Sequence, residues 1–228
     1  MNDQNGPPPA EQAPVEPTLP FEEAGRPFFA GLLETIKLFI TDPTTAFRRM
    51  SLTTDIFRPL IYGVLLSWVG DAAAYVFALM FHATIFGFLS QMGGMDEIIP
   101  TAVLGLGLGL FGLIIAPVFI VVGLFIYTLI VHLFLMMVGG DRKGFGATFR
   151  VICYSQTSQL AQLVPFAGGI IAWVWSVILA IIGLAEAHRT TTGKAAAAVL
   201  LPIVACCVCM VIVMMMAIAF GIQAGNWG

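Results

Sequence analysis

Hydrophobic segments of membrane-spanning length alternate along this chain with short polar stretches. The pattern is clearest in residues 145–188, where two apolar segments flank a turn at residues 165–169. Each segment has about 18 residues, and at about 1.5 Å per residue it nearly matches the hydrocarbon core of a bilayer. Arg150 and Glu186 lie far from the turn, so both are expected at the same membrane face. The pattern predicts a hairpin of two membrane helices.

Three further apolar segments predict three more spans. The first begins at residue 59, residues 100–138 are interpreted as one long helix bent at Pro117, and the last covers residues 195–220. Small residues and one acid recur at helical spacing on the first span, which favours close helix packing in lipid: Gly63, Ser67, Gly70, Asp71, Ala74 and Ala78. The predicted fold class is therefore an all-α membrane protein with five transmembrane helices in residues 59–228.

The residues before the first span divide into a tail and an amphipathic region. Residues 1–25 are rich in Pro, Glu and Gln and poor in aliphatic residues, so we expect a disordered tail. Residues 26–58 place apolar side chains at helical spacing, and Asp42 followed by Pro43 predicts the start of a second helix. Amphipathic helices next to a span are typical of the membrane interface. A soluble docking face for a protein partner is the alternative.

The positions of the basic residues predict the orientation of the chain. Five spans with a cytoplasmic N-terminus place all ten Lys and Arg residues on the cytoplasmic side. The opposite turns, at residues 92–100 and 165–169, contain none. This distribution is the usual pattern of multi-span proteins, and six spans would break it. The basic residues are Arg26, Lys37, Arg48, Arg49, Arg58, Arg142, Lys143, Arg150, Arg189 and Lys194.

Composition narrows the classes of function. A content of 59% hydrophobic and 10% charged residues does not fit a soluble globule. Topology accounts for the basic residues, so no nucleic-acid partner is expected, and no familiar catalytic or nucleotide-binding motif occurs. The four cysteines lie in apolar segments, which argues against a disulfide framework. Cys206, Met210 and Met214 share a helix face that suits Cu(I). Both residue types commonly fill apolar helices, however, so we expect no metal and no cofactor.

Asp71 is the strongest candidate for an intramembrane functional residue. An ionisable side chain at bilayer depth is costly and by default marks a functional site. Polar residues on the predicted third span are candidate neighbours of Asp71. Ser155, Gln159 and Gln162 form a stripe there, with Gln156 beside them. Two interpretations remain open. The stripe forms either a buried hydrogen-bonded network that joins helices or a water-filled path through the membrane.

A second cluster is expected at the cytoplasmic end of the hairpin. Arg150 and Glu186 are predicted to pair there, with His188 nearby. Charged groups are well tolerated at the membrane surface, so a structural clamp between adjacent helices is the favoured role for these three residues.

A set of residues in the hairpin and the segment after it has a recognisable spacing: Phe145, Thr148 to Val151, Tyr154, Pro165, the glycine turn, Gly183 to Glu186, His188, Thr192 to Ala195 and Pro202. In these residues the chain resembles the Yip-domain family, five-span membrane proteins named for binding Ypt/Rab GTPases. The resemblance covers residues 28–220 and implies five membrane helices with a cytoplasmic N-terminus. Eukaryotic relatives carry an Asp-Leu-Tyr-Gly-Pro motif before the first span; its absence here indicates a bacterial member and argues against Rab binding.

The resemblance and the residue pattern together favour a non-enzymatic scaffold with a membrane-organising or trafficking-type role. Its expected partners are the lipid bilayer and a membrane or cytoplasmic protein, and its expected location is the bacterial inner membrane. The alternative is a small-solute or ion permease that uses Asp71 and the polar stripe. An odd number of spans and the lack of a visible inverted repeat count against a permease.

Overall fold

The computed structural model describes residues 18–52, 55–90 and 98–225. These residues form α-helices and one 3-10 helix, and no strand occurs among them, so the all-α fold class is confirmed. The predicted tail at residues 1–17 and most of the predicted turn at residues 92–100 lie outside the described residues. In chain order the elements are α1 (Phe28–Thr41), α2 (Pro43–Arg49), α3 (Phe57–Ser90), α4 (Ile98–Met137), α5 (Phe145–Ser155), η1 (Gln156–Leu163), α6 (Gly168–His188) and α7 (Thr192–Gly225).

Four helices in the described part of the chain are long and apolar enough to cross a membrane. The spans are Phe57–Ile85 in α3, Gly107–Met137 in α4, Gly168–His188, which is α6, and Thr192–Ile218 in α7. α4 continues through Pro117 as one helix, as the sequence predicts. The count of five spans is not confirmed, because the predicted third span is divided between α5, with 11 residues, and η1, with 8 residues.

The segment formed by α5 and η1 lies inside the bundle. Every residue of α5 from Ala147 to Ser155 is buried. Hydroxyl groups bond back to the backbone where the helix changes type: Ser155 Oγ donates to the carbonyl of Val151 and Thr157 Oγ1 to that of Tyr154, both at 2.8 Å. Such back-bonding competes with helix hydrogen bonds and favours a change of helix geometry. At about 1.5 and 2.0 Å per residue, α5 and η1 together extend for roughly 32 Å.

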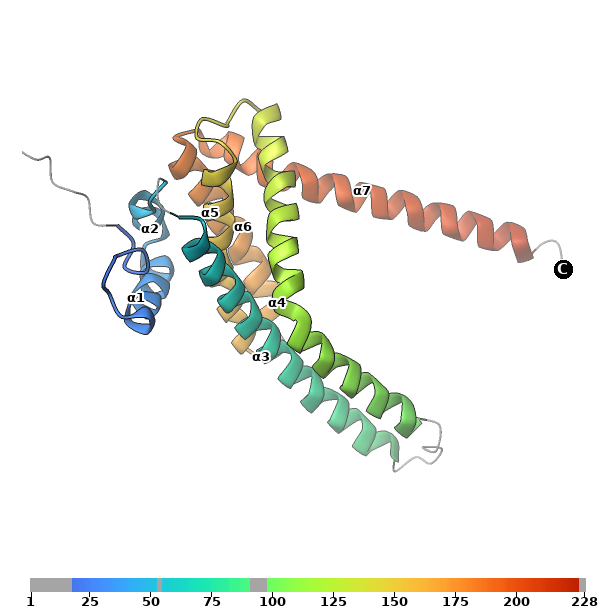
Figure 1. Cartoon of the computed structure of the whole chain (residues 1–228). Helices are drawn as coiled ribbons and strands as arrows, with labels where there is room; N and C mark the ends of the chain where they lie inside the picture. The colour runs from blue at the N-terminus through green and yellow to red at the C-terminus, as the bar shows by residue number, and fades with distance from the viewer. Residues whose placement is uncertain (1–17, 53–54, 91–97, 226–228) are drawn as a thin grey trace, which may run out of the picture.

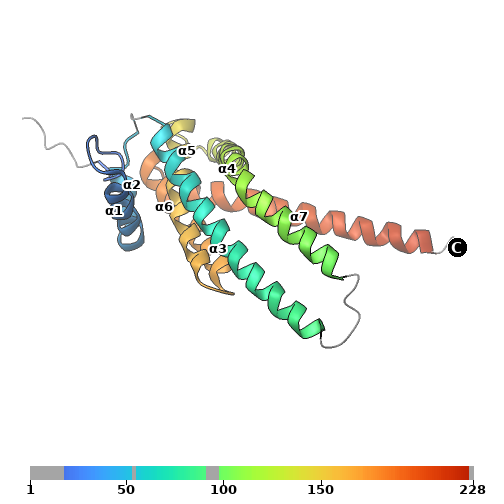
Figure 2. The ribbon, with the colours of Figure 1, turned by 60° about the horizontal axis from the view of Figure 1, so that its bottom comes forward.

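Small residues of α3 allow the inner segment to approach closely. A Cβ atom added to Gly70 would lie 2.7 Å from the carbonyl oxygen of Gln159. One added to Gly63 would lie 3.1 Å from the Cα atom of Cys153. The predicted small-residue face of the first span is therefore confirmed where it meets α5 and η1. Beyond this contact α3 and α4 continue side by side past the rest of the bundle (Figures 1 and 2).

α7 contacts the bundle through its first part. Ala195, Ala198 and Val199 are fully buried in that part, where α7 packs against α4 and α6. The remainder of the helix leaves the bundle at a wide angle (Figure 1). Its middle part, which includes Met210, exposes mainly apolar side chains, as the composition of a lipid-facing helix requires.

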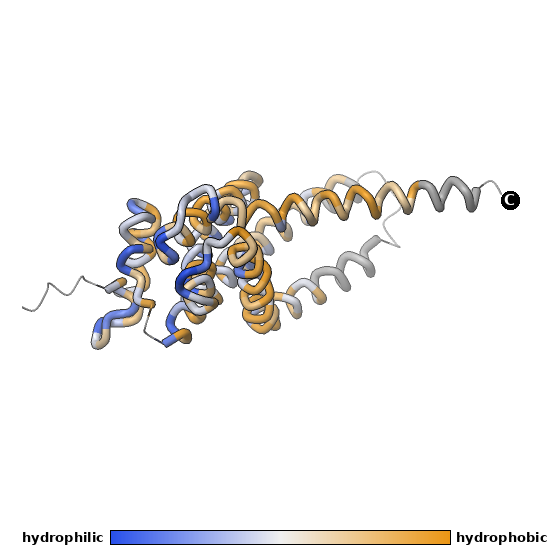
Figure 3. The backbone as a smooth tube through the Cα atoms, turned by 90° about the horizontal axis from the view of Figure 1, so that it is seen from above, coloured by the Kyte–Doolittle hydropathy of each residue, from blue (hydrophilic) through white to orange (hydrophobic). Residues whose placement is uncertain are grey.

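The N-terminal helices form as the pattern predicts. Asp42 caps α2 by accepting a hydrogen bond of 3.0 Å from the Thr45 N–H, and Pro43 opens the helix. The predicted boundary of the tail at residue 25 is wrong for residues 18–25. Leu19 is fully buried there, and the ring of Phe21 packs 5.6 Å from that of Tyr62. Hydrophilic residues gather in α1, α2 and the loops at the end of the molecule where these N-terminal helices lie (Figure 3).

Candidate functional site

Glu22 connects the N-terminal segment to the bundle. Its Oε1 atom accepts a hydrogen bond of 2.9 Å from the Tyr154 hydroxyl, and its Oε2 atom accepts one of 2.9 Å from the Ser51 N–H. Burial raises the pKa of this carboxyl group, and the two hydrogen bonds oppose the shift only in part. The nearby cations Arg150 and Arg58 also lower the pKa without reversing its direction. The contact is thus a buried polar link between segments distant in the sequence.

Arg48 and Glu186 connect α2 to α6. Nε of Arg48 lies 3.0 Å from Oε2 of Glu186, and its Nη2 lies 3.1 Å from Oε1. The predicted pairing of Arg150 with Glu186 is wrong. Arg150 is buried near Glu22 and donates from Nη1 to the carbonyl of Leu52. α2 packs on α6 and brings Arg48 to the carboxylate, and the sequence of the hairpin alone does not predict that docking.

His188 belongs to a second cluster, which has Thr148 at its centre. Thr148 Oγ1 lies 3.0 Å from His188 Nε2 and 3.0 Å from His132 Nδ1. His188 Nδ1 lies 3.1 Å from Asp141 Oδ1, and His132 Nε2 lies 3.8 Å from Asp141 Oδ2. These four side chains, called here the Thr148 ring, join α4, the α4–α5 loop, α5 and α6.

The Thr148 ring imposes an order on its protons. A threonine hydroxyl carries one proton, so Thr148 donates to only one of the two imidazoles. The backbone N–H groups of Arg142 and Lys143 each lie 3.3 Å from His188 Nδ1. That nitrogen donates to Asp141 Oδ1 when it carries the imidazole proton, and it accepts from the two backbone groups when His188 Nε2 carries the proton. Both sets of contacts hold the α4–α5 loop against the end of α6.

The described residues contain no group of three or more His, Cys, Asp or Glu side chains arranged to hold a metal ion. Cys206, Cys207 and Cys209 are exposed along α7. The Thr148 ring links α4, α5 and α6 through hydrogen bonds.

Asp71 lies apart from the polar stripe. Its side chain is exposed on α3 and makes no hydrogen bond or ion pair within the described ranges. The preceding residue, Gly70, is the one that faces Gln159 of η1. One residue further along an α-helix is rotated by about 100°, which turns Asp71 away from η1. The structure therefore does not bring Asp71 together with the stripe.

The stripe itself forms hydrogen bonds within η1 and to α3. Gln159 Oε1 accepts a hydrogen bond from Gln162 Nε2. Gln156 Oε1 accepts one of 3.1 Å from the hydroxyl of Ser67 on α3. Among the described residues, Ser155 bonds only to the backbone of its own helix. The two helices are thus linked through Ser67, a member of the small-residue face.

A cavity of about 240 Å³ lies beside the stripe, between η1 and helices α4, α6 and α7. The stripe contributes Ser155 and Gln159 to its polar lining, the adjacent Gln156 contributes a third group, and α4 and α6 contribute the others. Neither Asp71 nor Gln162 lines it. The polar lining residues are Tyr127, Ser155, Gln156, Gln159, Trp173 and Ser176.

Glu22, Asp141 and Thr148 are among the residues of these clusters whose roles were not predicted from the sequence. Glu22 follows Leu19 and Phe21, two apolar residues that interrupt the polar tail and signal docking. Asp141 and Thr148 show no such signal, because their partners lie on other helices. Thr148 appears in the sequence only as part of the family resemblance, without an assigned role.

A family model, the Yip1 domain, matches residues 36–214. This protein belongs to the Yip1 domain family. Comparison with curated proteins and with solved structures finds no match. The Yip1 match extends from the second half of α1 into α7, so it includes the Thr148 ring, the Arg48–Glu186 pair and the polar cavity. With its apolar helices, this Yip1-domain chain is an integral multi-pass membrane protein.

Proposed function

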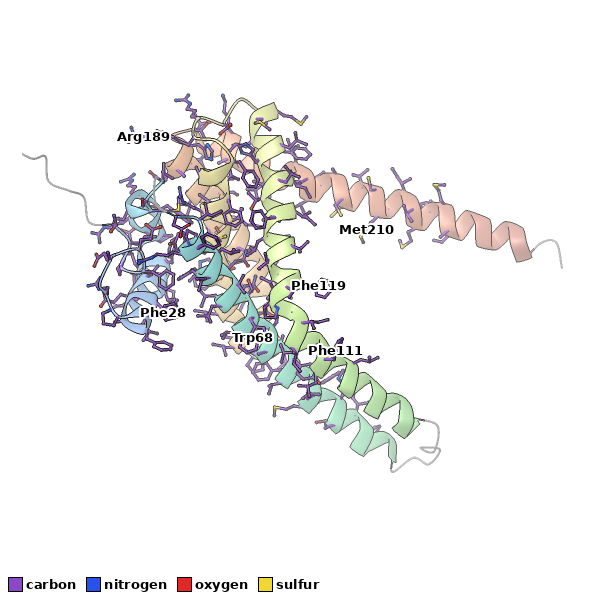
Figure 4. All side chains as sticks on the ribbon, viewed as in Figure 1. Phe28, Trp68, Phe111, Phe119, Arg189 and Met210 are labelled. Atoms are coloured by element: carbon purple, nitrogen blue, oxygen red, sulfur yellow. The ribbon has the colours of Figure 1, made fainter. Side chains whose placement is uncertain are left out.

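We propose that this Yip1-domain protein is a non-enzymatic membrane scaffold that holds α1 and α2 at the membrane surface for contact with lipid and a protein partner. The observation that carries the proposal is that α1 has two apolar faces. One face is buried on the bundle through Leu32 and Phe39. The other leaves Phe29 73% and Leu33 64% exposed, and Phe28 also points outward from α1 (Figure 4).

The exposed face of α1 is held in a fixed orientation. The Glu22–Tyr154 hydrogen bond and the Arg48–Glu186 pair attach the N-terminal segment and α2 to the bundle. An interfacial helix buries its apolar face by about 5–10 Å at the boundary of headgroups and acyl chains. Contacts within the chain keep the exposed face of α1 in this orientation, so no partner is needed to set it. A face held in this way suits a scaffold.

The proposed topology keeps the N-terminus in the cytoplasm of a bacterium and treats α5 with η1 as a fifth crossing. Its length of roughly 32 Å matches the hydrocarbon thickness of about 30 Å. The basic residues at this end support the same side for the loops, since Arg150 bonds to Leu52 and Lys194 Nζ donates to the carbonyl of Gly139 at 2.9 Å. Reporter fusions after Lys143 and after Gly168 test this topology, and a common side for both would contradict it.

Site-specific photo-crosslinking of the full chain in its native membrane tests the scaffold. A crosslinker at Leu33 is expected to capture lipid or one defined protein. The matched control at Leu32, which is only 6% exposed, is expected to capture the protein's own segments. Identical products from both positions would contradict the presentation of α1.

A permease is the second candidate, and the polar cavity is the observation that favours it. Asp71, which the sequence pattern suggested for a permease, does not line the cavity. Proton and ion flux into proteoliposomes, measured for the natural chain and for Asp71→Asn, separates the two functions. Flux that depends on Asp71 would overturn the scaffold, and absence of flux would leave the permease without support.

A further inference from the structure

The polar cavity lies near the middle of the spans that enclose it. Tyr127 is ten residues before the end of its candidate span, and Ser176 is twelve residues before the end of its own. At about 1.5 Å per residue these depths are about 15 and 18 Å. A hydrocarbon core is about 30 Å thick, so α4 and α6 both place the cavity near its centre.

Several polar groups that line the cavity have no protein partner. The described part of the chain offers none to the Gln159 amide nitrogen, the Tyr127 hydroxyl or the Trp173 indole N–H. Ser155 and Ser176 donate to backbone carbonyls of their own helices, each within 2.8 Å. Their oxygens remain able to accept hydrogen bonds. The cavity is therefore lined by hydrogen-bond donors that have no protein partner and by serine oxygens that can still accept a hydrogen bond.

This set of groups selects the chemical class of an occupant. None of the lining residues is an acid or a basic residue, and a charged ligand at this depth would need an opposite charge to offset its desolvation. An apolar ligand would leave the donors of Gln159, Tyr127 and Trp173 unsatisfied within the membrane. The volume of about 240 Å³ corresponds to roughly eight times the 30 Å³ share of a water molecule. A small neutral molecule with several hydroxyl groups fits all three constraints.

We propose that this cavity is a binding site for a small uncharged polyol of the size of glycerol, a property separate from the scaffold role. Hydroxyl groups of a polyol accept from Gln159, Tyr127 and Trp173 and donate to Ser155 and Ser176. A glycerol headgroup of a lipid has the same chemistry. It resides at the membrane surface, about 15 Å from the cavity, so the occupant is a free solute.

Saturation-transfer NMR with glycerol and the full chain in phosphatidylcholine nanodiscs tests this site. We expect a glycerol signal above that of empty nanodiscs. Tyr127→Phe and Gln159→Met are expected to weaken binding by about fivefold each, the effect of one lost hydrogen bond. Tyr75→Phe is the matched control, because Tyr75 lies against Gly109 of α4 and does not line the cavity. Its glycerol signal should stay unchanged.

Three results would overturn the site. The first is no signal above empty nanodiscs, and the second is an equal signal in all variants. The third is loss of the glycerol signal when phosphatidylglycerol is added to the nanodiscs, which would assign the cavity to a lipid headgroup. Circular dichroism melts verify that each variant is folded. Tyr127→Phe decides the test if Gln159→Met unfolds, because it removes one hydroxyl and no packing atoms of η1.

Discussion

The Tyr154 hydroxyl donates a hydrogen bond of 2.9 Å to Oε1 of Glu22, a residue 132 positions away in the chain. The bond lies inside an aromatic cluster, since the ring of Tyr154 stacks on Phe39 at 5.5 Å and packs against Tyr62 at 4.9 Å. A hydrogen bond in such surroundings is stronger than one in water, and losing one partner is correspondingly costly. The attachment of α1 to the bundle therefore depends on Glu22.

Replacement of Glu22 tests this dependence. Glu22→Ala is expected to lower the free energy of unfolding by about 1–3 kcal/mol, because the Tyr154 hydroxyl and the Ser51 N–H lose their acceptor. Glu22→Gln retains an oxygen acceptor and should cost less. Glu23→Gln is the control, since Glu23 makes a partly exposed ion pair with Arg26. Unfolding in detergent micelles measures all three, and equal effects of Glu22→Ala and Glu23→Gln would contradict the role of Glu22.

The raised pKa of Glu22 predicts a dependence of stability on pH. The folded state binds the Glu22 proton more tightly than the unfolded state does. Stability contributed by this group is therefore present in acid and falls as pH rises from the ordinary pKa of 4.5 through the raised value. Thermal midpoints measured from acidic to neutral pH should show this decline in the natural chain. Glu22→Gln should lack that component, and identical profiles would exclude Glu22 as its source.

Removal of the Thr148 hydroxyl should open the Thr148 ring. Thr148→Val keeps the shape of the side chain but leaves His132 Nδ1 and His188 Nε2 without their shared partner. We expect a loss of about 2 kcal/mol or more, since each unsatisfied buried group costs about 1–3 kcal/mol. Thr148→Ser retains the hydroxyl and should lose about 1 kcal/mol for the missing methyl group. Trypsin cleavage after Arg142 or Lys143 should accelerate in the valine variant. Cleavage at the natural rate would show that the ring does not hold the loop.

Substitution of glycine by alanine should change the free energy of unfolding differently in α3 and in α4. Gly70→Ala places a Cβ atom 2.7 Å from the Gln159 carbonyl oxygen, and we expect a loss of about 1–3 kcal/mol from overpacking. A Cβ atom at Gly112 meets nothing within 4 Å. Gly112→Ala should therefore be neutral or add up to about 1 kcal/mol through helix propensity. Unfolding midpoints compare the two, and a neutral Gly70→Ala would contradict the close approach of η1.

The Arg48–Glu186 pair should contribute less than the Glu22 contact. The Arg48 side chain is 63% exposed, and exposed ion pairs contribute about 0–1 kcal/mol. A double-mutant cycle with Arg48→Ala and Glu186→Ala is expected to give a coupling free energy below about 1 kcal/mol. The coupling should shrink further in high salt. A larger, salt-independent coupling would show that the pair is more shielded than its exposure indicates.

Features that depend on neighbouring residues were predicted from the sequence. Asp42 caps α2 through residues within the same turn, and Pro117 lies inside one continuous α4. The turn between η1 and α6 falls within residues 165–169 as the apolar pattern predicts. Capping, hydrophobic length and turn formation act over a few positions, so a single sequence contains their full pattern.

Contacts between residues distant in the chain were not predicted from the sequence, because they form only when the helices pack together. Glu186 binds Arg48 because α2 docks on α6. Asp71 misses the polar stripe because η1 packs against Gly70. The predicted third span changes to a 3-10 helix at Gln156, where hydroxyl back-bonding and tight packing act together.

The sequence by itself determined that this is an all-helical membrane protein of the Yip1 family, because hydrophobic length and local motifs are properties of contiguous residues. Only the tertiary structure decided which polar groups meet, as for Glu22 with Tyr154 and Thr148 with His132 and His188. The physical reason is that a buried polar group must find a partner wherever packing brings one within about 3 Å. Packing joins residues without regard to their separation in the chain.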